Sequence, residues 1–375
     1  MFFCTVQHFR FVPFCFNELE RFQMKVIQHS VGTLRTALVS KCHNLAQLYS
    51  KYTQEERLLL EEGLHPGQPG AIFQPITVHS DSDWIPAHPE APQDFESFYK
   101  DPYRKTPSAS HNTIYIQTIG SFEEVGSLTD QCVEWLREYC EAFFYGLAVK
   151  LLPAVTVAET GCTFRVNTNS HNLQILTGDL LLFLRNRKPE DAFCIVGITM
   201  IDLYPKDSWN FVFGEASLNM GMGVFSFARY DDKFYSRTYA GRLKKRLQPK
   251  PGDYSVFDGY YTPPITSNLL LRSCKTMTHE IGHMFGIKHC QWLSCVMQGS
   301  NHLDESDRRP LNLCPICLRK LQLSVSFKLA DRYKALLHWM DERGSSGPEE
   351  ASKPVQTFRP ARLWLCRCLD ILEKR

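Results

Sequence analysis

The chain has 375 residues, of which 43% are hydrophobic and 22% are charged. These proportions are those of ordinary globular proteins, so they exclude a disordered or fibrous chain. Lysine and arginine exceed aspartate and glutamate by only 42 − 40 = 2, which leaves no surplus of positive charge to neutralise a nucleic-acid backbone. No apolar run approaches the ~18 residues of a membrane span. We therefore expect neither a nucleic-acid partner nor a membrane span.

The chain has fourteen cysteines, and how they are used depends on whether its compartment is reducing or oxidising. Its first residues lack a basic leading region and a small-residue cleavage site, so we predict no signal peptide. In the reducing compartment that this implies, clustered cysteines more often hold metal than form disulfides. We expect a cytoplasmic location. The basic run at 244–246 would also suit nuclear import, although a solvated loop is the preferred interpretation.

The N-terminal third divides into three stretches. Residues 1–23 are expected to be an extension outside the fold, because a smoother sequence begins at Met24. Residues 24–63 have leucines at helical spacing and a capping-box pattern that begins at Thr53, which predicts helices. Residues 65–107 hold eight prolines and several aromatic side chains. We expect residues 24–110 to pack on the folded core; the alternative for the proline-rich part is a plain linker.

Strand and helix patterns alternate from residue 113 onward. Strands are predicted at 113–119, 149–157, 192–200, 211–213 and 224–228, and helices at 128–147 and 172–187. Pro153 indicates an edge strand or a bulge, whereas the run at 192–200 is apolar on both faces and indicates a central strand. The pattern predicts an α/β fold with a sheet of about five strands and mostly right-handed crossovers. Residues 111–340 would form the catalytic domain, followed at 341–375 by a flexible linker and a short closing helix at 358–372.

A helix predicted at 264–285 carries the chemistry. His279 and His283 lie one turn apart on it, so both imidazoles can bind one ion, while Glu280 lies beside that ion without being a ligand. Gly286 suits the left-handed residue that ends a helix, and the reversed chain then brings His289 as a third ligand. The alternative is a polar helix turn whose histidines have ordinary hydrogen-bond partners. Three imidazoles and an open fourth position describe a catalytic zinc ion.

Such a site favours hydrolysis of an amide. Imidazoles cancel none of the charge of the ion, so its water should ionise near neutral pH. Glu280 can then act as the general base and later pass the proton to the leaving amine.

Four cysteines follow immediately: Cys290, Cys295, Cys314 and Cys317. Four thiolates with no position for water describe a structural zinc ion, although a Cys-x-x-Cys pair alone could also be a redox pair. We therefore predict two zinc ions in total. Met297 lies where the chain could turn back beneath the first ion, although a lone methionine is more often core filler.

The run from His279-Glu280 through His283, Gly286 and His289 to Met297 resembles the signature of the metzincin zinc endopeptidases. The cysteines directly after His289, together with the run FCIVGITMIDLYP at 193–205, narrow the resemblance to the archaemetzincins over about residues 24–340. It implies a metzincin-like mixed sheet with a long active-site helix and a C-terminal zinc knuckle. It also implies a Met-turn at Met297, zinc on the three histidines and on the four cysteines, Glu280 as base, and a peptidase that could act as an aminopeptidase.

Two features concern the binding of substrate. No tyrosine follows Met297 closely, a position that some metzincins use to help hold the oxyanion. Other metzincins bind a peptide antiparallel to an edge strand, for which 210–217 is the candidate here. An aminopeptidase needs a carboxylate for the free amine of its substrate, and Glu215 is the candidate.

Two alternatives to a peptidase stay open. The chain could be a zinc scaffold, weakly active or inactive, that binds peptides or protein partners, or the four cysteines could be a recognition module that works alone. The preferred hypothesis is a monomeric zinc metallopeptidase that acts on a peptide or protein.

Overall fold

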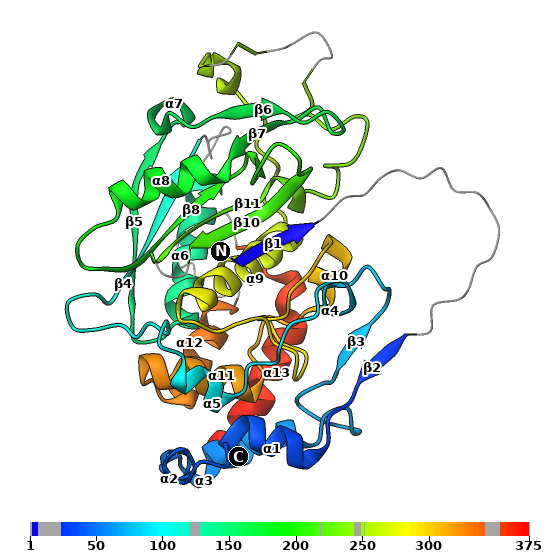
Figure 1. Ribbon diagram of the computed structural model, residues 1–375, viewed down its shortest axis with the longest axis vertical. Helices are drawn as coiled ribbons and strands as arrows, with labels where there is room; N and C mark the ends of the chain where they lie inside the picture. The colour runs from blue at the N-terminus through cyan, green and yellow to red at the C-terminus, as the bar shows by residue number, and fades with distance from the viewer. Residues whose placement is uncertain are drawn as a thin grey trace, which may run out of the picture.

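The computed structural model describes residues 2–6, 24–120, 128–217, 220–243, 249–250, 252–341 and 353–374. A mixed sheet with helices on its faces lies above a group of helices formed by both ends of the chain (Figure 1). The basic run at 244–246 and the spacer expected at 344–352 lie outside the described residues.

The main sheet has nine strands. They are β1 (Phe2–Val6), β4 (Thr113–Ile119), β5 (Ala148–Val155), β6 (Phe164–Val166), β7 (Leu173–Leu176), β8 (Ala192–Thr199), β9 (Asp202–Tyr204), β10 (Phe211–Ser217) and β11 (Met222–Ser226). Their order is β5-β4-β8-β11-β10-β9-β7-β6, with β1 also paired to β10. Strands β5, β4, β8 and β11 are parallel, and β10 runs antiparallel to β11, β9 and β1. The predicted mixed α/β architecture is confirmed, but the expected number of about five strands is wrong.

The predicted strands are placed as their side chains require. Every residue of β8 is buried between β4 and β11, which confirms the central strand expected at 192–200. Strand β5 lies at one edge of the sheet, the position expected from Pro153. The strand expected at 211–213 is β10, which continues to Ser217. The strand expected at 224–228 is β11, which begins and ends two residues earlier.

Two expectations need correction. Of the helix expected at 172–187, only Thr177–Arg187 is helical, as α8. Residues Leu173–Leu176 form the strand β7, and the side chains on both faces of its first three residues are buried. Residues 1–23 do not lie wholly outside the fold, since Phe2–Val6 pairs antiparallel with β10; residues 7–23 lie outside the described residues.

Helices cover both faces of the sheet. On one face α8 packs on β8, β10 and β11, and on the other α6 (Leu128–Phe143) and α9 (Ser267–Met284) pack on the same sheet. Two apolar clusters of buried side chains fill these layers. The predicted helix at 128–147 is therefore confirmed up to Phe143, and the one at 264–285 is confirmed from Ser267 to Met284.

The N-terminal region packs on the C-terminal helices. The N-terminal elements are β2 (Lys25–Ile27), α1 (Val31–Val39), α2 (His43–Ser50), α3 (Gln54–Glu61), β3 (Ile76–Val78), α4 (Trp84–Ala87) and α5 (Phe95–Lys100). The C-terminal helices are α10 (Leu303–Arg308), α11 (Pro315–Val325), α12 (Leu329–Trp339) and α13 (Arg359–Leu372). Helix α11 contacts α1, α3 and α5, while α13 contacts α3.

The proline-rich segment is held by its aromatic side chains. Phe73, Trp84, Phe95 and Phe98 are buried, whereas Tyr103 is 73% exposed. Burial of large apolar side chains is the main stabilising term for such an irregular segment. The segment is therefore packed on the core, and the alternative of a plain linker is not supported.

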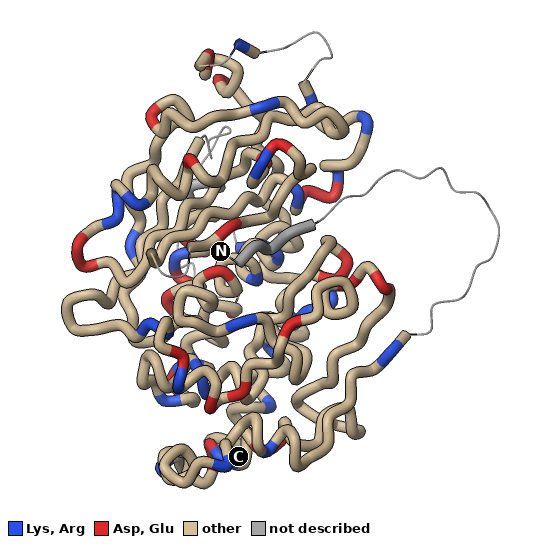
Figure 2. The backbone as a smooth tube through the Cα atoms, viewed as in Figure 1, with Lys and Arg blue, Asp and Glu red and all other residues tan. Residues whose placement is uncertain are grey.

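Charges of both signs alternate along the described backbone (Figure 2), as the small net charge of the whole chain suggests. In the part of the chain that the structure describes, no helix combines the length and apolarity needed to cross a bilayer.

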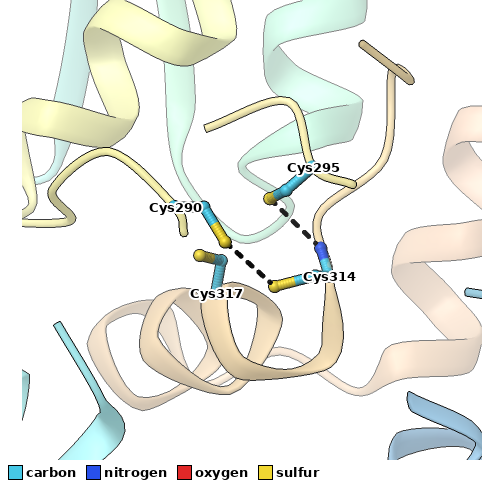
Figure 3. Close-up of side chains that lie close together, drawn as sticks. All are labelled: Cys290, Cys295, Cys314 and Cys317. Carbon is cyan, nitrogen blue, oxygen red and sulfur yellow. Dashed lines mark hydrogen bonds between the residues drawn. The ribbon is translucent and has the colours of Figure 1, made fainter. Parts of the chain in front are cut away.

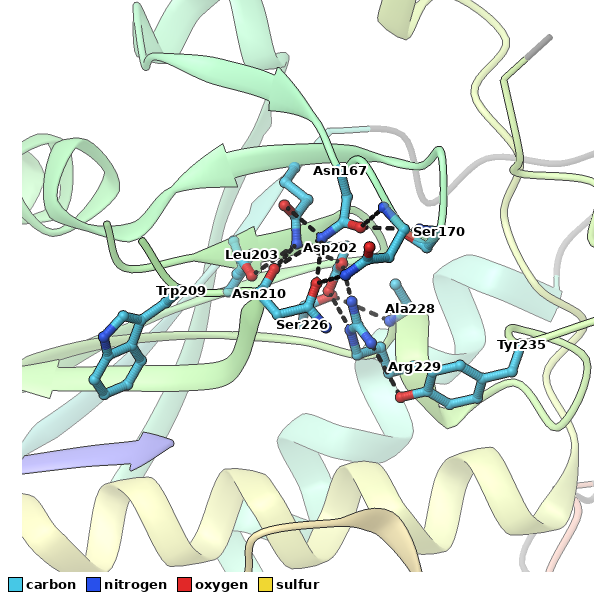
Figure 4. A network of polar contacts seen from close by, with 12 residues as sticks. Asn167, Ser170, Asp202, Leu203, Trp209, Asn210, Ser226, Ala228, Arg229 and Tyr235 are labelled. Atoms are coloured by element: carbon cyan, nitrogen blue, oxygen red, sulfur yellow. Dashed lines mark hydrogen bonds and ion pairs between the residues drawn. The ribbon is translucent and has the colours of Figure 1, made fainter. Parts of the chain in front are cut away.

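A buried polar network connects strands β7 and β9 with the segment that follows β11 (Figure 4). Asp202 on β9 accepts hydrogen bonds of 2.7 and 2.8 Å from the guanidinium of Arg229, and Gln174 on β7 donates to the same carboxylate at 2.8 Å. Because each buried charge here is paired and hydrogen-bonded, the burial is tolerated. The short helix η2 (Ala228–Tyr230) is thereby held in place, and the hydroxyl group of Tyr230 lies 2.5 Å from Thr276 Oγ1 on α9.

Candidate zinc centres

The last turns of helix α9 carry His279, Glu280 and His283. Thr266 caps its start by accepting a hydrogen bond from the backbone N–H of Leu269, and nearly every later side chain is buried. The helix stops at Met284, and Gly286 has φ +89°, the left-handed conformation predicted for it. A Cβ on Gly286 would also lie 3.2 Å from the backbone of Arg104, so the proline-rich segment approaches closely there.

The three predicted histidines converge. One ring nitrogen from each of His279, His283 and His289 lies within 4.8 Å of the others, and all three residues are buried. Nε2 of His283 lies 3.0 Å from Nε2 of His279, and Nε2 of His289 is buried without a hydrogen-bond partner in the described structure. The ring centroids lie between 4.5 and 5.3 Å apart.

The other ring nitrogens fix the tautomers. Nδ1 of His279 lies 2.8 Å from the carbonyl oxygen of Val296, and Nδ1 of His283 lies 2.6 Å from that of Ile287. A carbonyl oxygen can only accept, so each Nδ1 carries the proton and each Nε2 presents a lone pair. Two lone pairs facing each other at 3.0 Å repel, and a cation between them removes that repulsion. The donor set therefore fits zinc, which binds neutral imidazoles.

Burial keeps the imidazoles of His279 and His283 neutral. Loss of water and the neighbouring imidazoles and Arg309 hold the pKa of His279 well below its usual value. Burial, with the neighbouring imidazole of His289, lowers the pKa of His283 to about 3. Neutral rings bind a metal without first losing a proton.

Glu280 lies beside this cluster as a buried carboxylate, and its Oε1 has no hydrogen-bond partner among the described residues. Burial raises the pKa of Glu280 to about 7; the guanidinium of Arg309 opposes this shift, and the carboxylate of Glu215 adds to it. A carboxyl group with a pKa near neutrality is suited to accept and return a proton.

Glu280 and His279 also line a small cavity with residues from three other segments. Its remaining lining residues are Phe213, Tyr230, Thr276, Ser300, Ser306 and Arg309. Arg309 is buried and donates to the carbonyl oxygen of Gln298 and to Ser306 Oγ, which fixes the chain that follows Met297. Tyr230 reaches this cavity from η2, so a phenol lies near the site even though no tyrosine closely follows Met297 in the sequence.

Met297 lies directly beneath the histidine pair. A Cβ on Gly282, which stands between His279 and His283 in the helix, would lie only 2.6 Å from Met297 Sδ. Met297 is fully buried, and its carbonyl oxygen accepts a hydrogen bond of 2.8 Å from the backbone N–H of Cys290. This is the place expected for a Met-turn.

We expect Gly282→Ala to destabilise the protein by up to about 2 kcal/mol, because overpacking costs about 1–3 kcal/mol while alanine gains about 1 kcal/mol in a helix. Shortening the methionine removes the clash, so Gly282→Ala combined with Met297→Ala should cost less than the sum of the two single variants. Urea unfolding of the four proteins checks this, and simple additivity would contradict the contact.

The four predicted cysteines form a second cluster (Figure 3). Their sulfur atoms all lie within 4.8 Å of one another and all four residues are buried; Cys290 Sγ lies 3.6 Å from Cys314 Sγ. Cys295 Sγ accepts from the backbone N–H groups of Cys314 and Met297, at 3.2 and 3.4 Å. Burial raises the pKa of Cys295 and Cys314, so a bound cation is what would keep them as thiolates.

The cluster is built into the core. Cys314 stands at the N-cap position of α11 and Cys317 lies in the first turn of this helix, while Cys290 directly follows His289. None of the twelve described cysteines from Cys42 to Cys368 forms a disulfide. Because the cysteines are buried among core residues, this arrangement does not favour a recognition module that works alone.

The candidate residues for substrate binding lie near the histidines. The strand expected at 210–217 is β10, and Glu215 on it is buried and accepts a hydrogen bond from Thr177 Oγ1. One edge of β10 pairs with β11 and β9, and the other pairs with β1. A peptide could pair with that second edge only in place of β1.

Sequence reasoning missed a third acidic residue. Glu90, in the proline-rich segment, accepts a hydrogen bond of 3.0 Å from Nδ1 of His289, although 199 positions separate them. Trp84 packs edge-on against the ring of His289, with centroids 4.7 Å apart. No local pattern marks Glu90, since nothing around it predicts which distant residue it meets.

Comparison with known proteins gives the family. Residues 113–323 match the model described as peptidase family M54. The archaemetzincin-2 proteins of Homo sapiens and Mus musculus are each 56% identical to this chain, over 94% of it and 100% of their own length. A crystal structure of archaemetzincin from Methanopyrus kandleri is 27% identical, covers 59% of this chain and 99% of its own, and has a TM-score of 0.41. The chain belongs to the archaemetzincin family of zinc metallopeptidases, peptidase family M54.

Proposed function

We propose that His279, His283 and His289 hold the catalytic zinc ion of this metallopeptidase and that Glu280 is its general base. The observation that carries the assignment is the convergence of one ring nitrogen from each of the three histidines beside a buried carboxylate whose Oε1 has no protein partner in the described structure. Zinc held there would polarise the peptide carbonyl and acidify water. Glu280 takes a proton from the attacking water at its carboxylate and delivers it to the leaving amine.

We also propose that the four cysteines hold a second, structural zinc ion. Four buried sulfur atoms within 4.8 Å of one another, with backbone N–H groups donating to one of them, support this assignment. Such a site leaves no position for water, so its contribution is to the fold.

Metal analysis of the purified protein, combined with digestion of a peptide library, tests both proposals. We expect two zinc ions per chain and cleavage of peptides. Bound zinc without any cleavage across a broad library would favour the alternative of a scaffold that binds peptides or partners.

The proposed mode of cleavage is removal of N-terminal residues, with Glu215 binding the free amine of the substrate. In support, Glu215 is buried near enough to Glu280 for its charge to raise the pKa of that residue, so it lies within electrostatic reach of the reacting centre. A buried carboxylate binds an ammonium group more strongly than an exposed one does.

Glu215→Ala is expected to remove the preference for substrates with a free N-terminus. Hydrogen bonds to charged groups contribute about 1.5–3 kcal/mol, so the ratio of kcat/KM for a free peptide to that for its acetylated form should fall by about 10- to 100-fold. Glu138→Ala, which removes an exposed carboxylate of α6, is the matched control. An unchanged ratio in Glu215→Ala would exclude this role.

A further inference from the structure

The proline-rich segment braces the loop that carries the third histidine. Gln93 is buried; its side-chain Nε2 donates to the carbonyl oxygen of Gly286 at 3.0 Å, and its Oε1 accepts from the backbone N–H of Lys288 at 3.0 Å. The carbonyl oxygen of Gln93 in turn accepts from the indole N–H of Trp292 at 2.9 Å. The Gln93 side chain therefore holds both Gly286, just beyond the end of α9, and Lys288, the residue before His289.

The same segment holds the imidazole itself. Glu90 accepts from Nδ1 of His289 through Oε1 at 3.0 Å, with Oε2 at 3.2 Å, and the indole N–H of Trp84 donates to Glu90 Oε1 at 3.2 Å. The backbone N–H of Trp84 is anchored on Glu305 Oε1 at 2.8 Å, and its ring covers His289 edge-on. The ring of His289 thus has a carboxylate on its Nδ1 side and an aromatic wall beside it.

His289 differs in this respect from the other two histidines. Nδ1 of His279 and of His283 lies closest to a backbone carbonyl oxygen, 17 and 4 positions further along the chain, and Arg309 Nη1 lies farther from Nδ1 of His279, at 3.3 Å. The partner of His289 is a charged side chain 199 positions away, and it lies outside residues 113–323, which match the family model.

We infer that Glu90 is a positioning residue for the third zinc ligand, through which the N-terminal region completes the catalytic metal site. The inference rests on the proposed binding of zinc by the three histidines. A carboxylate on Nδ1 fixes the tautomer, aims Nε2 at the ion and makes the imidazole a stronger ligand. Its negative charge also offsets part of the charge of the ion, which three neutral imidazoles leave uncompensated.

The experiment measures metal binding by the full chain. Metal-free wild type, Glu90→Ala and Glu90→Gln are titrated with Zn²⁺ against a competing chelator and with Co²⁺, whose visible spectrum distinguishes imidazole from thiolate ligands. Removing such an outer carboxylate typically weakens metal binding by about 10- to 100-fold. We expect that loss in Glu90→Ala and a smaller one in Glu90→Gln, since an amide oxygen still accepts the hydrogen bond but lacks the charge.

Two controls separate positioning from a general loss of structure. Glu96→Gln changes a carboxylate of the same segment that contacts Ser40 and Lys100 instead of the site, and it should bind Zn²⁺ within about twofold of wild type. The thiolate Co²⁺ band, and the melting temperature of the protein that keeps only the cysteine-bound ion, should be unchanged in both Glu90 variants.

Three results would overturn the inference. Wild-type affinity at the histidines in both Glu90 variants would show that Glu90 does not position His289. An equal loss at both metal sites, with a lowered melting temperature in Glu90→Gln as well as Glu90→Ala, would assign Glu90 a purely structural role. If wild type itself binds no ion through imidazoles, the proposed function fails together with the inference, and the absence of the imidazole spectrum identifies that case.

Discussion

Glu280→Gln should lower kcat for peptide hydrolysis by about 10²- to 10⁴-fold, the usual contribution of a general base, while the zinc content stays that of wild type. The amide has the size of the carboxylate but cannot take a proton from water. Because Oε1 of Glu280 has no protein hydrogen-bond partner in the described structure, the exchange breaks no internal contact there. Kinetics with a peptide substrate and metal analysis of the same preparation check both halves of the prediction.

The same variant makes a prediction for the stability of the protein when its histidine site holds no ion. Burial raises the folded-state pKa of Glu280 from 4.5 to about 7, so the folded protein binds more protons than the unfolded chain in that interval. Stability must then fall as pH rises through this window, and the penalty is complete above it. Glutamine has no such penalty, so Glu280→Gln with an empty histidine site should melt at or above the temperature of the equally treated wild type near pH 8.

Two outcomes would contradict the role of Glu280. Turnover within tenfold of wild type, with zinc bound, would mean that another group takes the proton. Loss of zinc from Glu280→Gln would mean that the residue supports the ion and is more than a base. Glu138→Gln on the exposed side of α6 serves as the control for handling and expression.

The histidine cluster was predictable because its geometry is local. The helical spacing of His279 and His283 and the left-handed residue at Gly286 are encoded within eleven positions, and the structure brings His289 to them. The four cysteines were predictable for the same reason, since the two pairs lie close in sequence. Glu90 was not, because its contact with His289 depends on how the whole N-terminal region packs.

In the fold, too, long local patterns were predictable and short elements were not. Long periodic segments such as β4, β8 and α9 were located to within three residues. Short strands were not: β6 and β9 have only three residues each, which is too few to show a period. In β7, Leu173 and Ile175 have a strand alternation, but four residues directly before a helix also fit a helical start.

Cys317→Ser should remove the structural zinc ion and unfold the segments that the four cysteines hold together. Structural zinc contributes about 10–16 kcal/mol in zinc-finger peptides, as much as the whole stability of about 5–15 kcal/mol of a typical domain. The cluster joins the chain after His289, the chain before Met297 and the first turn of α11, so its loss should also loosen the third histidine. We expect zinc content to fall from two ions per chain to one or none and activity to fall with it.

The control is Cys366→Ser, which changes an exposed cysteine on α13 and should leave zinc content, melting temperature and activity unchanged. The two variants differ only in whether the thiol belongs to the buried cluster, so the comparison separates loss of the ion from loss of any thiol. A Cys317→Ser protein that keeps the wild-type melting temperature and both ions would show that three thiolates suffice. Equal thiol reactivity of the folded wild type at Cys317 and Cys366 would show instead that no ion protects the cluster, because a thiolate bound to zinc and buried in the core reacts far more slowly than an exposed one.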